Sequence, residues 1–303
     1  MTLDSSARYH NDGSLISIVI PAFNEEMAIG ETLRDLESTL RLSRRTHEII
    51  VVDDGSKDNT AAEVEKTSAR LIRHSRNRGY GASLKTGTLA ANGVIVVFYD
   101  ADNQFEATDI ERIVDELGGS DAVLGNRTTG SYAPFSRRGG KKLLSWFADY
   151  LMKQKIPDLN CGFRAIRRDV LLRYLHLLPN GFSASTTTTL VLLKENCDVK
   201  YMPIVVKKRI GQSTVRPLRD GLDTALLVLR LTTLLDPFRV FGPVSAVLFV
   251  LGTAWGLRYI LMRKGLSVAA LFLLVSAVMI FFFGLLADQV ASLRREQRYS
   301  DRP

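Results

Sequence analysis

The sequence is poor in the residues that build thiolate metal sites and disulfide frameworks, with 2 cysteines and 4 histidines among 303 residues. Cys161 and Cys197 show no ligand spacing with the histidines, which gives little support to a zinc site or disulfide framework and predicts reduced thiols. No secretory leader is predicted either. The first dozen residues are polar, and the first apolar run leads into Pro21. We therefore expect the amino-terminal domain to stay in the cytosol.

Familiar nucleotide and nucleic-acid motifs are missing as well. There is no Gly-Lys-Ser or Gly-Lys-Thr of a Walker loop, and Gly79-Tyr80-Gly81 lacks the third glycine of a dinucleotide-binding loop. The net charge of +8 suits an anionic membrane surface, phosphate ligands or nucleic acid. Because the basic residues are scattered and form no recognisable nucleic-acid module, no nucleic-acid partner is predicted.

Charge is absent from two long apolar runs, residues 240–257 and 265–287. Each approaches the roughly 20 residues that cross a bilayer. A buried helical hairpin is the alternative, but stretches such as 279–286 lack the polar face of a globular surface helix. We predict two transmembrane helices within 239–290 and a polar tail over 291–303, disordered from residue 294. Basic residues flank the hairpin and favour cytoplasmic termini; they are Arg230, Arg239, Arg294, Arg295 and Arg298.

The strongest positive signal is a strand-like run, residues 94–99, that ends in Asp100-Ala101-Asp102. Residues i and i+2 of an extended chain point the same way, so both carboxylates can face one divalent cation shared with a diphosphate. The alternative is an acidic strand end that starts a turn. Two further apolar runs, 16–20 and 48–52, also end in polar clusters. In a parallel sheet these clusters converge at one edge.

Between these strands lie helical patterns, predicted over 25–42, 58–69, 80–92 and 107–117, with short strands over 70–74 and 122–125. This alternation predicts repeated βα units around a parallel sheet.

Three motifs resemble the signatures of family-2 glycosyltransferases with the GT-A fold: Val-Ile-Pro-Ala-Phe-Asn-Glu-Glu at 19–26, Val-Val-Asp-Asp-Gly-Ser at 51–56 and Asp-Ala-Asp-Asn-Gln at 100–104. Asn-Cys-Gly-Phe-Arg-Ala at 160–165 and Lys-Arg-Ile-Gly-Gln-Ser at 208–213 are similar to the dolichyl-phosphate mannose synthase-like branch, which makes polyprenyl-phosphate sugars. The implied fold is α/β, a Rossmann-like, mostly parallel sheet flanked by helices, with a carboxy-terminal transmembrane hairpin. The predicted layout is a cytosolic catalytic domain over 1–219, an interfacial helix over 220–238, two spans over 239–290 and the tail.

The resemblance implies an inverting enzyme that transfers a hexose from a nucleotide-diphosphate sugar to a polyprenyl phosphate at the cytoplasmic membrane face. Mg²⁺ or Mn²⁺ would be the cofactor, and the oligomeric state stays open, a homo-oligomer included. An anionic acceptor needs cations, and arginine grips phosphate through paired donors. By motif, the donor-binding residues are Pro21, Ala22, Phe23, Glu25, Asp53, Asp100 and Gln104; the metal group is Asp100, Asp102 and Gln104; the catalytic residues are Asp102, Arg127 and Arg209; and the acceptor-phosphate residues are Arg127, Arg209 and Arg138, preferred over Arg137.

Two alternative functions remain. A processive polysaccharide synthase shares the donor domain, but the sequence has no Gln-x-x-Arg-Trp element and only two spans. A catalytically silent adaptor conflicts with intact carboxylates at three strand ends. One segment departs from the mannose synthase pattern: Ser183 to Thr189 is rich in hydroxyls where an acidic stretch is expected, which leaves the sugar open. These hydroxyls could contact donor or acceptor, but we favour helix capping and packing.

Overall fold

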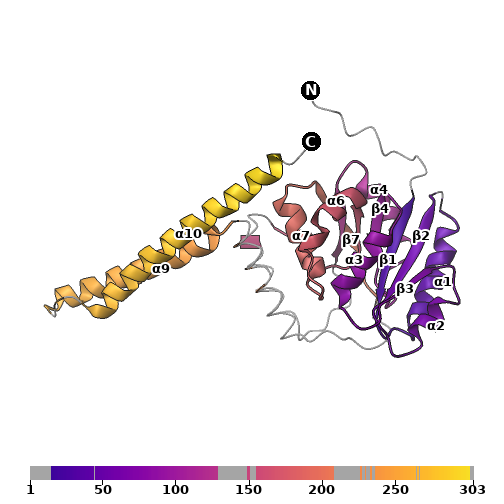
Figure 1. The fold of residues 1–303 in the computed structure, drawn as a ribbon, viewed down its shortest axis with the longest axis horizontal. Helices are drawn as coiled ribbons and strands as arrows, with labels where there is room; N and C mark the ends of the chain where they lie inside the picture. Colours follow the sequence, from indigo (N-terminus) through magenta and orange to yellow (C-terminus); the bar gives the residue numbers. More distant parts are fainter. Residues whose placement is uncertain are drawn as a thin grey trace, which may run out of the picture. The chain divides into compact units, whose positions relative to one another are not determined.

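The computed structural model describes residues 15–43, 45–128, 149–150, 155–207, 226, 229, 233, 236–263, 265 and 267–300, without the side chains of 294–300. The chain divides into two units, Met1–Thr224 and Ala225–Pro303. The first holds an α/β domain and the second a helical hairpin (Figure 1).

The described part of the first unit contains a seven-stranded sheet with the order β3-β2-β1-β4-β6-β5-β7. All neighbouring strands are parallel except β6, which runs antiparallel to β4 and β5. The strands are β1 (Ile16–Ala22), β2 (His47–Asp53), β3 (Arg70–Arg73), β4 (Ile95–Phe98), β5 (Ala122–Arg127), β6 (Arg164–Arg167) and β7 (Val199–Ile204).

Helices connect the strands and cover the sheet, and α1 and α2 pack side by side near β2 and β3 (Figure 1). The helices are α1 (Ile29–Leu40), α2 (Thr60–Val64), α3 (Tyr80–Ala90), α4 (Asp109–Leu117), α6 (Arg168–Tyr174) and α7 (Ala184–Lys194), with a 3₁₀ turn η3 (Leu175–Leu177). The predicted α/β plan with a mostly parallel sheet is confirmed.

The two faces of the sheet follow the two-residue period of a strand. Along β1, Ile16, Ile18 and Ile20 join the core that contains the apolar sides of α1 and α4. Val19 points the other way, toward α3, and a Cβ added at Gly87 would lie 2.2 Å from its Cγ1. A glycine at this position therefore lets α3 pack closely against the central strand.

The predicted helix over 58–69 is wrong beyond Val64, where α2 ends. The hydroxyl of Thr67 donates to the Val64 carbonyl at 2.7 Å, and Ser68 donates from both its backbone N–H and its hydroxyl to Glu37. Such local bonds from hydroxyl side chains compete with helical hydrogen bonds and favour a turn.

The second unit is an antiparallel pair of long helices, α9 (Phe238–Leu261) and α10 (Val268–Ser300). Small side chains allow the two helices to approach: Ser245 Oγ donates to the Ala277 carbonyl at 2.9 Å, and Gly252 faces Leu273 and Leu274. Both helices are long and apolar enough to cross a membrane. Most of their large apolar side chains are exposed, as with Phe282 at 58%. A helix buried in a soluble core would not show this, so a lipid environment explains the pattern.

The predicted disorder from residue 294 is wrong as far as Ser300, because α10 continues to that residue. The Arg-Arg-Glu-Gln-Arg stretch at 294–298 consists of good helix formers, and it extends a helix that is already nucleated. Most of the predicted interfacial helix over 220–238 lies outside the described residues, so it stays a prediction.

Candidate active site

Three polar loops meet at the carboxyl edge of the sheet because β1 lies between β2 and β4. Ala22 pairs with Asp53 across β1 and β2, and Val19 pairs with Phe98 across β1 and β4. Asp100 follows two residues after Phe98. The predicted convergence of the clusters at 21–26, 53–56 and 100–104 is therefore what the sheet order produces.

The first two loops are locked together by hydrogen bonds that the sequence analysis did not anticipate. Asn24 has a left-handed backbone, with φ of 54°. Its N–H donates to Ser56 Oγ at 2.9 Å, and its side-chain oxygen accepts from the Lys57 N–H at 2.9 Å. The Glu25 N–H donates to Thr60 Oγ1 at 2.8 Å. Asn24 thus fixes the loop after β2 relative to β1.

Asp53, the last residue of β2, is completely buried. Its Oδ1 accepts from the Ser56 N–H at 2.9 Å. Its Oδ2 lies 3.0 Å from Arg73 Nε but outside hydrogen-bonding geometry, and it has no hydrogen-bond partner. Such an oxygen is costly to leave unsatisfied. It marks a position where a ligand donor can be accepted.

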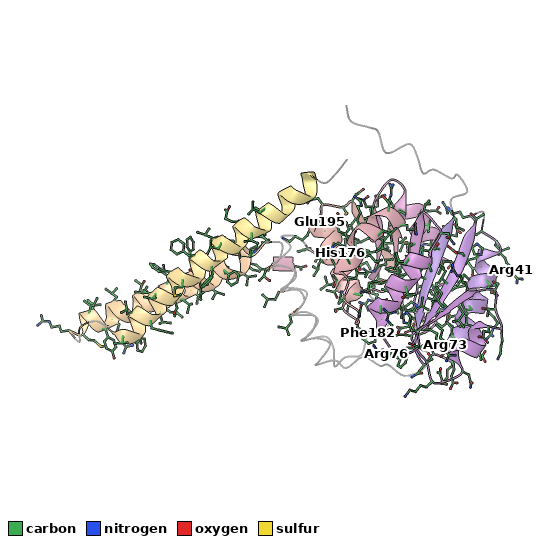
Figure 2. All side chains as sticks on the ribbon, in the orientation of Figure 1. Arg41, Arg73, Arg76, His176, Phe182 and Glu195 are labelled. Atoms are coloured by element: carbon green, nitrogen blue, oxygen red, sulfur yellow. The ribbon has the colours of Figure 1, made fainter. Side chains whose placement is uncertain are left out.

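Beside this pair lies a cavity of about 690 Å³. This volume is in the range of ligand-binding clefts. Figure 2 shows Arg73 and Arg76 at the same end of the domain as Phe182. The cavity is lined by Phe23, Gly55, Ser56, Lys57, Arg73, His74, Ser75, Arg76 and Asn77. Of the predicted donor-binding residues, Phe23 lines the cavity, Asp53 contacts its wall at Arg73, and Pro21 and Ala22 end the neighbouring strand.

Asp54 is buried and has a structural role. Its carboxylate accepts the N–H groups of Arg78 and Gly79 at 2.9 and 2.7 Å, and His74 Nδ1 lies 2.7 Å from Oδ1. His74 Nε2 in turn lies 2.9 Å from Thr86 Oγ1. Asp54 therefore shapes the loop that supplies residues 74–77 to the cavity wall and sets the start of α3.

The third loop closes on an aromatic cluster. Tyr99 is buried and donates its hydroxyl to the Phe105 carbonyl at 2.6 Å, and its ring contacts Phe105 and Phe163 edge to face. Burial raises the pKa of Tyr99, so the phenol keeps its proton. This contact bends the chain over residues 99–105 and holds the two carboxylates between its ends.

Asp100 is half-buried, and its Oδ1 lies 3.3 Å from the hydroxyl of Tyr80. Asp102 is 6% exposed, and its Oδ1 accepts from the Gln104 N–H at 3.3 Å. Asn103, which lies between Asp102 and Gln104, has φ of 55°, the left-handed conformation that asparagine tolerates. The turn that the sequence suggested is therefore present at these residues, and the shared cation stays a prediction.

Gln104 is fixed to the end of β7. Its side-chain amide donates to the Lys207 carbonyl at 3.1 Å, and the Lys207 N–H donates to its backbone carbonyl at 2.9 Å. Lys207 Nζ also lies 2.9 Å from Glu106 Oε1. The segment that follows β7 is therefore hydrogen-bonded, at Lys207, to the loop that carries the acidic pair.

The donor chemistry of this loop fits Mg²⁺ or Mn²⁺ that is held together with a substrate. Among the described residues, no group of three or more His, Cys, Asp or Glu side chains could enclose an ion. Mg²⁺ in phosphoryl-group sites usually takes one or two carboxylates and completes its shell with phosphate oxygens and water. Asp100 and Asp102 provide such an incomplete set.

Arg127, at the end of β5, grips a carboxylate. Its Nε lies 2.6 Å from Asp158 Oδ2, and its Nη2 lies 2.7 Å from Asp158 Oδ1 and 2.6 Å from Asn160 Oδ1. Burial opposes the charge on each partner, but the pairing prevails: it raises the pKa of Arg127 and lowers the pKa of Asp158. Arg127 thus supports the 158–164 loop. The other predicted phosphate-binding residues, Arg138, Arg137 and Arg209, lie outside the described residues.

Arg164 makes structural contacts that the sequence analysis did not predict. It is completely buried; its Nη1 donates to the Ser185 carbonyl at 2.8 Å, and its Nη2 donates to the Cys161 carbonyl. Burial lowers the pKa of Arg164. The only available signal was its place in the motif at 160–165. The hydroxyls that follow Ser185 are buried, and Thr187 and Thr188 bond to carbonyls four residues back, which agrees with helix packing.

Comparisons with known proteins agree with this geometry. Residues 17–175 match Glycosyl transferase family 2, and residues 236–293 match the GtrB C-terminal hairpin.

Two kinds of curated relatives are similar to the chain. An undecaprenyl-phosphate 4-deoxy-4-formamido-L-arabinose transferase of Pseudomonas fluorescens strain Pf-5 is 31% identical, over 62% of this chain and 61% of the relative. Its counterpart in strain SBW25 is 30% identical, over 89% of this chain and 80% of the relative. A dolichyl-phosphate hexose transferase of Haloferax volcanii is 29% identical, over 68% of this chain and 89% of the relative.

Among solved structures, glucosyl-3-phosphoglycerate synthase from Mycobacterium tuberculosis, in complex with Mn²⁺, UDP-glucose and phosphoglyceric acid, has a TM-score of 0.58. It is 22% identical and covers 73% of this chain and 80% of its own. This likeness supports the GT-A fold predicted from the motifs.

Proposed function

The chain belongs to glycosyl transferase family 2, and from this premise we propose that it is a membrane-bound transferase that moves a sugar from a nucleotide-diphosphate sugar to a polyprenyl phosphate. The observation that carries the proposal is the combination of one sheet edge, where Asp53, Asp100 and Asp102 meet, with a hairpin that matches a membrane family. Relatives named as undecaprenyl-phosphate and dolichyl-phosphate transferases support the acceptor class.

We place the nucleoside of the donor in the cavity lined by Phe23, Ser56 and Arg73. Asp53 Oδ2 is an acceptor without a hydrogen-bond partner, next to a guanidinium donor. Uracil offers the complementary pair, one ring N–H flanked by carbonyls, and could take the place that Arg73 Nε now holds. Guanine would need two adjacent acceptors, and Asp53 Oδ1 already accepts from Ser56. We therefore favour a UDP-sugar.

The donor diphosphate would lie against Asp100 and Asp102 through a shared cation. When bound, Mg²⁺ or Mn²⁺ would supply charge neutralisation for the nucleoside diphosphate that leaves. Asp100 and Asp102 would fix the position of the cation. Gln104 ties their loop, through the Lys207 carbonyl, to the segment that precedes Arg209.

The acceptor is an ionised phosphate, so a dedicated general base is less necessary than for an alcohol. One phosphate oxygen would attack the anomeric carbon while the bond from that carbon to the diphosphate oxygen breaks, which inverts the configuration. The diphosphate leaves with the bonding electrons. Arg138 and Arg209 are proposed to hold the acceptor phosphate, and Arg127 would join them by exchanging part of its contact with Asp158.

The basic flanks of the hairpin support termini on the cytoplasmic side. The active domain would then draw nucleotide sugars from the cytosol. Lipid phosphate would reach it from the adjacent leaflet.

The test uses the full chain in lipid nanodiscs with undecaprenyl or dolichyl phosphate, Mn²⁺ and a panel of UDP- and GDP-sugars. We expect a lipid-linked sugar with at least one UDP-sugar, and none with Asp102→Asn. Absence of product from every donor in both lipids would overturn the proposal. Product from GDP-sugars alone would overturn the assignment of the base.

A further inference from the structure

We propose that Tyr80 is a positioning residue that holds the Asp100 carboxylate in the orientation needed to bind a divalent cation. The inference rests on the proposed function because it assigns Asp100 to the cation. Tyr80 is the first residue of α3, and its hydroxyl lies 3.3 Å from Asp100 Oδ1. A carboxylate that accepts a hydrogen bond on one oxygen loses rotational freedom.

The other oxygen is limited by Gly162. A Cβ added at this position would lie 2.5 Å from Asp100 Oδ2 and 2.9 Å from Oδ1. Real Cβ atoms do not approach oxygen so closely, so the glycine backbone packs directly against the carboxylate. Asp100 is therefore held between the phenol of Tyr80 and the backbone of residue 162.

Tyr80 itself has little freedom to move. Its ring stacks on Phe182, with centroids 5.8 Å apart and planes 18° from parallel. The start of α3 fits closely against the loop that precedes α7, since a Cβ at Gly79 would lie 2.4 Å from the Asn180 carbonyl oxygen. Gly79 also has φ of 101°, a conformation that other residues rarely adopt. The position of the phenol is thus set by α3 and by the loop before α7.

Arg164 connects both sides of this clamp. Its Nη2 donates to the carbonyl of Cys161, the residue before Gly162, and its Nη1 donates to the carbonyl of Ser185, three residues after Phe182. Burial of a guanidinium is expensive unless it is hydrogen-bonded, and here Nη1 and Nη2 are bonded while Nε has no hydrogen-bond partner. These two hydrogen bonds fix the distance between the backbone at Gly162 and the stacked rings of Tyr80 and Phe182.

The functional consequence concerns cation affinity. Groups that hydrogen-bond to a ligating side chain orient that side chain, and their loss typically weakens metal binding or activity by about 10- to 100-fold. In the described part of the chain no third His, Cys, Asp or Glu side chain joins the two carboxylates, so we expect the cation to depend on their orientation. Removal of the Tyr80 hydroxyl alone should therefore weaken Mn²⁺ binding and leave the fold intact.

The test is Tyr80→Phe in the full chain in nanodiscs, with Mn²⁺ titrated in the presence of UDP and free ion measured by electron paramagnetic resonance. We expect Mn²⁺ affinity to fall about 10-fold. In turnover assays, the Mn²⁺ activation constant should rise while saturating Mn²⁺ restores most of kcat. A merely structural role would instead lower kcat at all Mn²⁺ concentrations.

The matched control is Tyr201→Phe, which removes a buried hydroxyl that has no hydrogen-bond partner. It should leave Mn²⁺ affinity unchanged. Asp100→Asn should abolish Mn²⁺ binding, and this variant sets the lower limit of the measured Mn²⁺ affinity. If Tyr80→Phe is destabilised, Phe182→Leu offers a second test. It keeps the Tyr80 hydroxyl and removes only the ring on which Tyr80 stacks. A smaller loss of Mn²⁺ affinity is expected from it.

The outcomes separate the two proposals. Wild-type Mn²⁺ affinity in both Tyr80→Phe and Phe182→Leu overturns the positioning role, whatever the turnover. A wild-type protein that binds Mn²⁺ with UDP but transfers no sugar overturns the proposed function, while loss of affinity in Tyr80→Phe would still support the role of Tyr80.

Discussion

Arg127 and Asp158 form a two-point ion pair, with Nε 2.6 Å from Oδ2 and Nη2 2.7 Å from Oδ1. The carboxylate occupies the same fork of donors that a phosphate would use. The pair also anchors the loop that brings Gly162 to Asp100. Arg127 therefore supports this loop, and its exchange with an anionic acceptor stays a proposal.

Removal of this arginine should destabilise the protein in a pH-dependent way. Arg127→Met leaves Asp158 largely buried without its partner, and we expect about 2 kcal/mol lower unfolding free energy at pH 7, less than for a fully buried pair. The pKa of Asp158 is lowered in the folded state by Arg127. The stabilisation is therefore complete above the unfolded-state pKa of about 3.9 and is lost as pH falls through the lower folded-state value.

Chemical denaturation at pH 7 and near pH 3 measures this difference. The matched control is Arg173→Met, because Arg173 pairs with Asp169 on the surface, and it should change stability by less than about 0.5 kcal/mol. An equal effect of the two variants at pH 7 would contradict the prediction.

Gly162→Ala should damage the acidic pair directly. The new Cβ would overlap the Asp100 carboxylate, so the loop or the side chain must shift, at a cost of about 1–3 kcal/mol. We expect Mn²⁺ affinity in the presence of UDP to fall by more than about 10-fold. Gly119→Ala is the control, because nothing lies within 4 Å of its added Cβ. Normal Mn²⁺ binding by Gly162→Ala would refute the close packing.

Asp54→Ala should destabilise the cavity wall. The change leaves the partly buried N–H groups of Arg78 and Gly79 without this acceptor and removes one of the two side-chain partners of His74, which should cost about 3 kcal/mol. UDP affinity should fall with it, because His74 and the residues after it line the cavity. Thermal unfolding and nucleotide titration test this, with Asp169→Ala as a surface control. Unaltered unfolding would show that the network is dispensable.

Both cysteines should resist alkylation in the folded protein. Burial raises the pKa of Cys161 to about 12 and the pKa of the less buried Cys197 to about 11. At pH 8 both thiols therefore remain protonated and react slowly. Mass spectrometry after iodoacetamide treatment should find neither residue modified in the native chain and both modified after denaturation. Rapid native labelling of Cys161 would be inconsistent with its burial.

Much of the first half of the domain could be predicted because its signals are local. Apolar runs ending in polar clusters marked β1, β2 and β4, and helical spacing marked α1, α3 and α4. Errors arose where a side chain competed locally, as Thr67 does after α2. The antiparallel strand β6 was not predicted, since its pairing with β4 and β5 depends on neighbours far away in the sequence.

The same distinction applies to the site. Asp53, Asp100 and Asp102 could be named from the sequence because each carries its chemistry at a strand end. The roles of Asn24, Tyr80, Gly162 and Arg164 could not, because each role is a contact with a residue distant in the chain. Arg127 shows the difference well: its motif indicates an anion-binding residue, and only the structure shows that Asp158 is the anion it holds.

The sequence by itself determined the α/β class, the acidic strand ends and the apolar hairpin, because hydrophobic periodicity and the length of uncharged runs are written along the chain. The tertiary structure decided which oxygens of the acidic residues are already bonded, which loop closes on Asp100 and how α3 and α7 hold it. Those properties depend on packing and hydrogen bonds between segments that meet only after folding.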